Sequence, residues 1–258
     1  MRLLILGGTA EAAALAGAAV TGFGDALSVT SSLAGGSESP APRHGDVRIG
    51  GFGGAAGLAA YLGSENIGLL IDATHPFAAE MSRQARLAAD AAGVPRLMLR
   101  RPAWKRHPED RWIKTEDLAG AARAVRSLGR RAFLTVGAGD LAPFAPLHEV
   151  HFLVRLVDPP RAPLPLRFYE VIVGRGPFAL AEERHLMALH GVDVLVTMAS
   201  GGGATEAKLV AARESSLPVV MVRRPPAEPG ERVETVAAAL DWIGARLGGP
   251  RACDRTHA

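Results

Sequence analysis

The sequence contains two glycine turns, each between an apolar run and a helical stretch. The residues of such turns could bind a phosphate or another anion. In ILGGTAEA, residues 5–12, Gly7 and Gly8 follow the apolar run and Thr9 precedes an alanine-rich stretch. Free amides at a helix N-terminus favour a phosphate, and glycine lets the backbone approach it closely. Thr9 could cap the helix or bond the phosphate. The full signature G-x-G-x-x-G is absent, so a tight turn without a ligand stays the alternative.

The second glycine run lies in VTMASGGGATEAKLVAAR, between a predicted strand and a predicted helix. It consists of Ser200, Gly201, Gly202 and Gly203. A hydroxyl beside successive glycine amides is typical of an anion site, Thr205 is the expected cap of the helix, and Lys208 could point at the same anion. A flexible connection with a surface lysine is the competing interpretation. No Lys-Ser or Lys-Thr pair closes the run, which excludes a Walker phosphate loop.

The segment IDATHPFA, residues 71–78, places Thr74 and His75 where a predicted strand ends and a helix begins. Ligands of open α/β sheets bind at this end of the strands. His75 could therefore donate a proton or bind a carboxylate. Pro76 suits a first helical turn, so a cap formed by Thr74 or His75 is the alternative.

The end of the second predicted strand, VTSSLAGG, offers no Asp or Glu to hold a ribose diol. This absence disfavours a standard NAD site. Ser31, Ser32 and nearby amides could instead meet a phosphorylated ribose, although a polar turn explains them equally well. A further glycine turn in LTVGAGDLAPF, residues 134–144, is interpreted as unliganded.

The charge and the aromatic content of the chain distinguish between nucleic acid and a small anion as the expected ligand. The net charge is +3 with a pI of about 9.5, but the basic residues are scattered and aromatic residues make up 5%. A base-stacking surface for nucleic acid is therefore not expected, and a small anionic ligand is. The chain has no G-x-S-x-G elbow and no H-E-x-x-H spacing, so neither a serine hydrolase nor a metal site is predicted.

Cellular context follows from the cysteine and from the apolar runs. One cysteine, Cys253, forms no internal disulfide, which suits a reducing cytoplasm. No apolar run approaches the roughly 20 residues that cross a bilayer. We expect a cytoplasmic protein without membrane or nucleic-acid partners, and a monomer or small homo-oligomer.

Short apolar strands alternate with helical stretches along the whole chain, which predicts α/β structure with parallel sheets covered on both faces. In the first part the predicted strands are Arg2–Leu6, Ala26–Ser32, Val47–Ile49, Ile67–Asp72 and Arg96–Arg100, and the helices are Ala10–Val20, Ala55–Leu62 and Ala78–Ala92. In the second part they are Arg131–Val136, Val150–Arg155, Tyr169–Val173, Val194–Thr197 and Val219–Val222, with helices Ala179–Leu189, Glu206–Ser215 and Val233–Leu247. We predict a cofactor-binding lobe at 1–114, a second lobe at 115–248 and a tail at 249–258.

Taken together, the motifs resemble the precorrin-6A reductase family of cobalamin synthesis in order and spacing, from about Met1 to Pro226. They are ILGGTAEA, the SLAGG loop, RIGGFGG at 48–54, IDATHPFA, RRPAW at 100–104, GRGPF at 174–178, and SGG…T…K…AAR before PVVMVRRP. The resemblance implies two Rossmann-like lobes with parallel sheets and a cleft between them. It implies reduction of one macrocycle double bond of precorrin-6A, giving precorrin-6B, with hydride added to one carbon and a proton to its neighbour. NADPH is the reductant implied, with NADH used in the cobalt-containing branch.

The sequence departs from the family pattern at three places. Met198 and Ala199 replace a lysine and a polar residue, Gly36 replaces an arginine, and Gly137–Asp140 replaces T-G-R-Q. These changes imply relocated phosphate contacts, a weaker cofactor preference or an altered substrate.

From the motifs and the resemblance we assign three sets of site residues. The expected cofactor-binding residues are Gly7, Gly8, Thr9, Ser32, Gly35, Thr74, Ser200, Gly201, Gly202 and Lys208. The expected substrate-binding residues are Arg100, Arg101 and Arg223, and His75 is the candidate proton donor, with solvent as its rival. The alternatives are an NAD(P)-dependent reductase of a smaller anionic substrate and a non-catalytic nucleotide-binding sensor.

Overall fold

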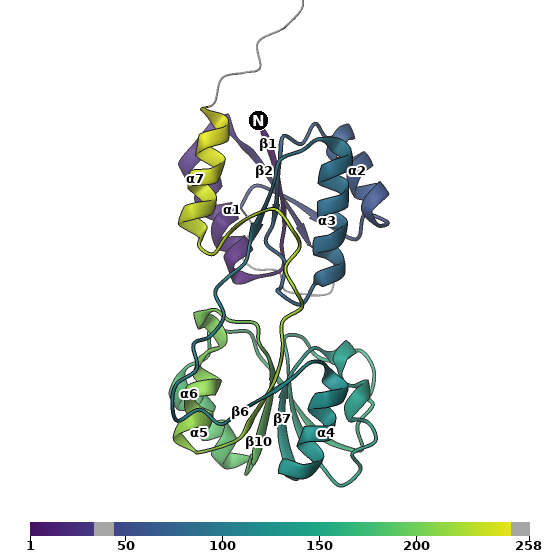
Figure 1. Ribbon diagram of the computed structural model, residues 1–258, viewed down its shortest axis with the longest axis vertical. Helices are drawn as coiled ribbons and strands as arrows, with labels where there is room; N and C mark the ends of the chain where they lie inside the picture. Colours follow the sequence, from purple (N-terminus) through teal and green to yellow (C-terminus); the bar gives the residue numbers. More distant parts are fainter. Residues whose placement is uncertain (34–43, 249–258) are drawn as a thin grey trace, which may run out of the picture. The chain divides into compact units, whose positions relative to one another are not determined.

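A computed structural model describes residues 1–33 and 44–248 of the chain (Figure 1). It divides into two compact units. Unit 1 contains Met1–Arg101 together with the chain from Pro226 onward, and unit 2 is the continuous segment Pro102–Pro225. Gly35, Gly36, Cys253 and the predicted tail 249–258 lie outside the described residues.

Unit 1 is built on a six-stranded sheet in the order β12-β5-β4-β1-β2-β3, in which every strand pair is parallel. Its strands are β1 (Arg2–Leu6), β2 (Ser28–Leu33), β3 (Asp46–Ile49), β4 (Leu69–Asp72), β5 (Arg96–Leu99) and β12 (Glu231–Val233). The chain builds outward from β1 through β2 to β3, and then returns to the other side of β1 with β4. The strand order therefore reverses between β1 and β4, which is where open α/β sheets bind ligands.

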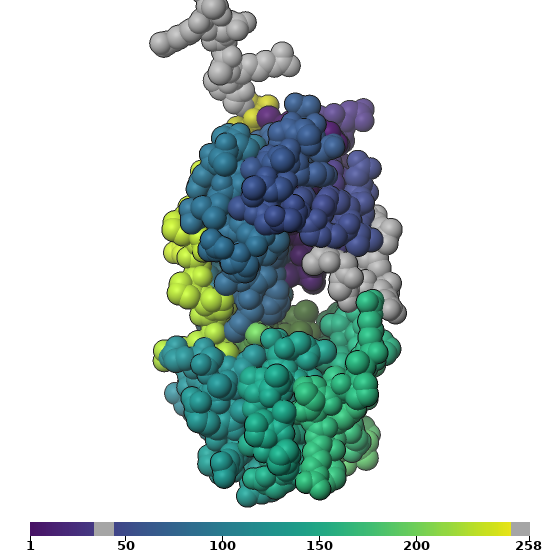
Figure 2. Space-filling model, turned by 90° about the vertical axis from the view of Figure 1, so that its right-hand side faces the viewer, coloured from purple at the N-terminus to yellow at the C-terminus, as the bar shows by residue number. Residues whose placement is uncertain are grey.

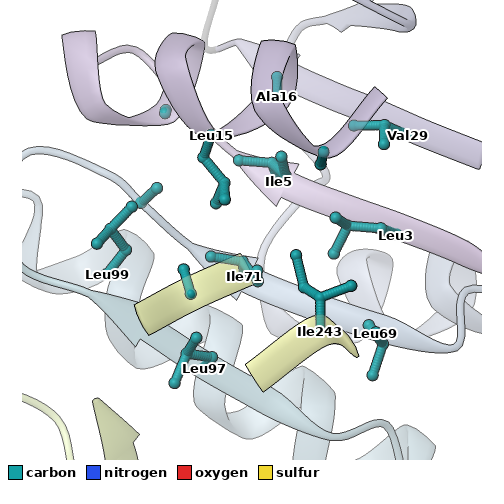
Figure 3. Packing of buried hydrophobic residues seen from close by; sticks show 14 of the residues in the cluster. Leu3, Ile5, Leu15, Ala16, Val29, Leu69, Ile71, Leu97, Leu99 and Ile243 are labelled. Atoms are coloured by element: carbon teal, nitrogen blue, oxygen red, sulfur yellow. The ribbon is translucent and has the colours of Figure 1, made fainter. Parts of the chain in front are cut away.

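Helices cover both faces of this sheet. On one face lie α1 (Ala10–Phe23) and α7 (Val236–Leu247), and on the other lie α2 (Ala55–Ser64) and α3 (Ala79–Ala92) (Figure 1). The alternation of side chains along β1 explains the two layers. Leu3 and Ile5 pack in the cluster beneath α1 and α7, which includes Ile243 (Figure 3). Leu4 and Leu6 pack in the cluster beneath α2 and α3.

Unit 2 has its own six-stranded parallel sheet, in the order β6-β11-β10-β7-β8-β9. Its five other strands follow the order of unit 1, but the edge strand β6 comes first in the chain, whereas β12 comes last. The strands are β6 (Trp112–Thr115), β7 (Arg131–Thr135), β8 (His151–Leu156), β9 (Phe168–Val173), β10 (Val194–Met198) and β11 (Val219–Val222). The α-helices are α4 (Leu118–Leu128), α5 (Leu180–Leu189) and α6 (Ala207–Glu214). Four short 3-10 helices complete the described chain: η1 (Gly24–Ala26) in unit 1, and η2 (Ala138–Asp140), η3 (Ala142–Phe144) and η4 (Gly203–Thr205) in unit 2. In unit 2 the strand order reverses between β7 and β10, so each unit offers one edge of the kind that binds ligands.

The predicted fold class, α/β with two Rossmann-like lobes and parallel sheets, is confirmed. The predicted lobe limits are wrong at both ends of the second lobe. Residues 102–114 belong to unit 2, because β6 pairs with β11. The chain from Pro226 to 248 belongs to unit 1, because β12 pairs with β5 and α7 packs on α1. Chain order was the basis of the prediction, whereas the open edge of β5 and the apolar face of α1 decide where this segment lies.

The lengths of the helices show whether any of them could span a membrane. In the described part of the chain, no helix is both long enough and apolar enough to span a bilayer.

Candidate functional site

The carboxyl edge of the unit 1 sheet brings together most of the residues predicted in the first half of the chain. Strand register aligns Leu6 of β1 with Ser32 of β2 on one side and with Asp72 of β4 on the other. The turns that follow β1, β4 and β5 therefore leave the sheet side by side. They carry Gly7, Gly8, Thr9, Thr74, His75, Arg100 and Arg101.

The turn between β1 and α1 has an open side. The Gly7 amide donates to the Ser32 carbonyl at 2.9 Å, which fixes the turn against β2. Gly8 has a φ of 106°, which L side chains rarely adopt, and no atom of the described residues lies within 4 Å of the place a Cβ would take. Within the described residues the amides of Gly8 and Thr9 donate to no acceptor. The turn thus offers backbone donors and free space, the two things a phosphate needs.

Thr9 is the N-cap of α1, which confirms the first of its two predicted roles, a helix cap or a phosphate ligand. Its hydroxyl accepts from the Ala12 amide at 3.1 Å and donates to the Ala73 carbonyl at 2.8 Å. The hydroxyl proton is therefore used to join this turn to the turn after β4. Any contact of Thr9 with a phosphate must come from its backbone amide.

Asp72 shapes the turn after β4. The side chain is buried, and Oδ1 accepts from the Thr74 amide at 3.2 Å and from the Thr74 hydroxyl at 2.7 Å. Its Oδ2 is buried with no hydrogen-bond partner in the described residues. A buried carboxylate oxygen without a donor is costly, so it marks a place where this edge is incompletely satisfied.

His75 lies on this turn and not at a helix cap. The N-cap of α3 is Ala78, which makes no side-chain cap bond, so the predicted capping role of Thr74 or His75 is wrong. The Nδ1 atom of His75 accepts from the Phe77 amide at 3.4 Å, and the two rings lie 5.8 Å apart. With Nδ1 as acceptor, the proton of the neutral ring is on Nε2. The ring can therefore present an N–H donor.

A small pocket, open to solvent, lies between the ends of β4 and β5 and the start of α3. It is lined by Asp72, Thr74, His75, Pro76, Ala79, Ser82, Met98, Leu99, Arg100, Pro226, Ala227 and Glu228. Burial lowers the pKa of Arg100, the nearby Arg232 acts in the same direction, and Asp72 opposes both. Arginine stays protonated in proteins, so the pocket combines a cation with a hydroxyl and an imidazole.

Arg101 is already paired on the other side of this edge. Its Nη1 lies 2.9 Å from Glu11 Oε2, and both side chains are largely buried. The pair ties the end of β5 to the first turn of α1. Its charge is thus compensated within unit 1, and its substrate role stays a prediction.

The carboxyl edge of the unit 2 sheet carries the second glycine run. Arg224 donates to the carbonyls of Ala199, Ser200 and Pro102, the last two at 2.6 and 3.1 Å. The indole of Trp104 donates to the Gly202 carbonyl at 2.7 Å. The run's carbonyls are therefore held by side chains, while the amides of Gly201 and Gly202 donate to no acceptor among the described residues.

Lys208 and Thr205 differ from their predicted roles. Lys208 is the second residue of α6, is buried, and has its Nζ 5.7 Å from the centroid of the Trp104 ring. The interpretation as a surface lysine is therefore excluded. Thr205 ends η4, and the N-cap of α6 is Glu206, so the predicted Thr205 cap is wrong.

Arg223 follows β11 at the same edge. Its side chain is 57% exposed and pairs with Glu116. The predicted site residues thus form two sets, one on the carboxyl edge of each unit. The described residues contain no group of three or more His, Cys, Asp or Glu side chains suited to a metal.

Comparison with known proteins identifies the family. The family model "Precorrin-6x reductase CbiJ/CobK" matches residues 2–244. The chain belongs to this family. A precorrin-6A reductase of Rhodococcus erythropolis is 48% identical over 244 residues, which cover 94% of this chain and 97% of that protein. One from Rhodobacter capsulatus is 39% identical, with 97% and 98% covered.

The similarity extends to structure. A solved structure titled "CobK precorrin-6A reductase" superimposes with a TM-score of 0.88 at 38% identity, covering 96% of this chain and 97% of that one. A cobalt-precorrin-6A reductase of Priestia megaterium is 30% identical over 182 residues, 66% of this chain. The family resemblance seen in the motifs is confirmed, and the chain is an oxidoreductase of this family.

Several side chains that shape the candidate site of this chain were not predicted from sequence. Asp72 was interpreted as the end of a strand, and Trp104 and Arg224 were not connected with the glycine run. The RRP segment carries Arg224 next to the predicted Arg223, so the basic pair itself was a signal. Strand pairing decides which of the two arginines contacts the glycine run, and the order of residues in the sequence does not reveal strand pairing.

Proposed function

We propose that this chain reduces precorrin-6A to precorrin-6B in cobalamin biosynthesis, with NADPH as the reductant. One observation supports this above all: relatives that cover almost the whole chain at 38–48% identity are named precorrin-6A reductases. The reaction adds a hydride to one carbon of a carbon–carbon double bond and a proton to its neighbour.

The carboxyl edge of unit 1 fits a dinucleotide. Bound NADPH would supply the hydride, and the protein must hold and orient it. The amides of Gly8 and Thr9 suit the pyrophosphate, since they donate to no acceptor among the described residues. Gly7 and Ser32 set the shape of this turn through their 2.9 Å backbone bond. By the strand order, the adenosine half extends over β2 and the nicotinamide half over β4 and Thr74.

The substrate is a macrocycle with many carboxylates, and cations at the two edges suit it. Arg100 lines the pocket of unit 1, and we keep Arg101 and Arg223 as further carboxylate-binding residues. In unit 2 the amides of Gly201 and Gly202, which donate to no acceptor in the described part of the chain, would form an anion site with Ser200 and Lys208. That site holds either a cofactor phosphate or a substrate carboxylate.

His75 is the proposed proton donor. It lines the pocket and its ring can present an N–H. Solvent is the rival source, because it needs no positioned side chain. His75→Ala should lower turnover by about 100-fold, the typical size of a lost general acid, while NADPH affinity changes little. Unchanged turnover would remove His75 from this role.

The decisive experiment mixes the protein with NADPH and precorrin-6A and follows nicotinamide absorbance. Oxidation that requires the tetrapyrrole supports the proposal. Oxidation driven by smaller polycarboxylates would favour the reductase of a smaller substrate. Nucleotide binding without oxidation of either substrate would identify a sensor. The same titration with NADH in place of NADPH decides the cofactor.

A further inference from the structure

Arg48 has a position in the sheet that sequence inspection did not single out. Register places it directly beside Ser32, which in turn is level with Leu6 of β1. Arg48 therefore stands two strands from the phosphate-binding turn, about 10 Å away at the usual strand spacing. Paired residues of parallel strands project to the same face, so Ser32 and Arg48 share the face of Leu6, which α2 and α3 cover. Figure 2 shows the outer side of these two helices.

The side chain of Arg48 is fixed. Its Nη1 donates to the carbonyl of Gly50, and its Nη2 donates to that of Gly51 at 2.7 Å. The guanidinium also lies 3.8 Å from the centroid of the Phe52 ring and 5.3 Å from that of Tyr61. Gly50 and Gly51 follow the end of β3, so these contacts hold the guanidinium at the carboxyl edge of the sheet.

The charge of Arg48 has no carboxylate partner within the described residues. Most other arginines of unit 1 pair with one, as Arg2 does with Glu65 and Arg101 with Glu11. The two bonds to glycine carbonyls use two of the five N–H groups of a guanidinium, which leaves donors for a ligand. A half-buried, pre-oriented guanidinium with no carboxylate partner among residues 1–33 and 44–248 is suited to bidentate binding of a phosphate.

The nature of that phosphate follows from the strand order. The adenosine ribose of a dinucleotide reaches the end of β2, where NAD-binding sites carry an acid for the 2′-hydroxyl. Here Ser31 and Ser32 stand at that end, and the neighbouring strand supplies a cation. We propose that Arg48 binds the 2′-phosphate of NADPH and sets the preference for NADPH over NADH. The inference rests on the proposed function and adds a residue to it.

Two adenosine fragments test this without turnover. The full-length protein is titrated by calorimetry with 2′,5′-ADP and with 5′-ADP, which differ in the 2′-phosphate. The wild-type protein should bind 2′,5′-ADP at least about tenfold more tightly. Arg48→Met keeps the apolar stem and removes the charge. It should weaken 2′,5′-ADP binding about 10- to 100-fold, as expected for a lost charge-assisted hydrogen bond, and leave 5′-ADP within about twofold.

Two further variants control the result. Arg48→Lys keeps a positive charge but loses the planar guanidinium, so it should lose part of the preference for 2′,5′-ADP over 5′-ADP. It is also the milder change and replaces Arg48→Met if that variant does not fold. Arg2→Met removes another arginine of unit 1 at the opposite end of β1, and the preference should stay unchanged.

The outcomes separate this inference from the proposed function. Equal weakening of both fragments by Arg48→Met would overturn the inference, because Arg48 would then only hold the glycine loop. An unchanged preference in that variant would overturn it as well. A wild-type protein that binds NADH and NADPH equally would remove the inference and leave the reductase proposal standing. A wild-type protein that binds neither nucleotide would remove both.

Discussion

The glycine turn after β1 and the glycine run after β10 both lie at the carboxyl edge of a parallel sheet, beside the point where its strand order reverses, yet they are held in opposite ways. At Gly8 a Cβ would meet no atom of the described residues within 4 Å. At Gly201 a Cβ would fall inside contact distance of the Pro102 carbonyl and the Arg224 guanidinium. Both glycines have a positive φ, which favours glycine, but only Gly201 is also needed for close packing.

The difference teaches that one motif can serve two purposes. The turn of unit 1 is fixed by strand pairing and by Thr9, and keeps its outer side free. The run of unit 2 is fixed from behind by Arg224 and Trp104, which bind its carbonyls. In both cases amides donate to no acceptor among the described residues, but only the second turn depends on side chains from a distant segment.

The largest expected effect is on folding. Gly201→Ala forces the Pro102 carbonyl and Arg224 apart at a φ of 66°, and should cost about 3–5 kcal/mol of unfolding free energy. Gly8→Ala meets no atom and should cost about 1–3 kcal/mol from its φ alone. Urea denaturation followed by circular dichroism compares the two variants. Equal losses would show that packing does not distinguish the two glycines.

The second effect is on nucleotide affinity. The methyl group of Gly8→Ala occupies the space proposed for the pyrophosphate, so NADPH should bind at least about tenfold more weakly, a loss of about 1.4 kcal/mol. Gly22→Ala is the matched control, because Gly22 lies on α1 with equally open surroundings. Calorimetry on folded protein gives both values. Full affinity in Gly8→Ala would place the cofactor elsewhere.

A smaller effect is expected at Thr9. Thr9→Val removes the cap of α1 and the bond to the Ala73 carbonyl, and should cost about 1–2 kcal/mol of stability. Thr9→Ser keeps both bonds and should stay close to the wild type. If the two variants were equally stable, the hydroxyl would not be what joins the turns after β1 and β4.

The smallest effect is expected at Trp104. Trp104→Phe removes the donor to the Gly202 carbonyl and should cost about 1 kcal/mol. Trp112→Phe is the control, because the Trp112 indole nitrogen is buried without a partner among the described residues, so its removal breaks no bond. Thermal unfolding of both variants checks this, and a greater loss for Trp112→Phe would contradict it.

Much of the fold could be predicted from sequence, because most strands are buried apolar runs. The limits of β1, Arg2–Leu6, and of β11, Val219–Val222, were predicted to the residue. Two short edge strands, β6 and β12, were missed, since their half-exposed side chains give no apolar run. Helix α4 was also missed, although Asp117 caps it and its buried alanines follow a helical spacing. That signal was present and was overlooked.

The site was predictable only where it depends on local sequence. The turn at Gly7 and Gly8 follows from a strand, two glycines and a helix in succession. Arg48 and Asp72 were not predicted, because the importance of each depends on what lies beside it in the neighbouring strand. Register between strands is set by tertiary packing, so no spacing along the chain reveals it.

The discontinuity of unit 1 has a consequence for protein synthesis. Unit 2 is one continuous stretch, so all of its residues have left the ribosome once Pro225 has emerged. Unit 1 must wait for Trp242 and Ile243, which close the cluster beneath α1. Until α7 is translated, the apolar side of α1 stays exposed to solvent. A chain that terminates early at Pro225 would therefore contain a complete unit 2 and an incomplete unit 1, whose exposed apolar surface favours aggregation.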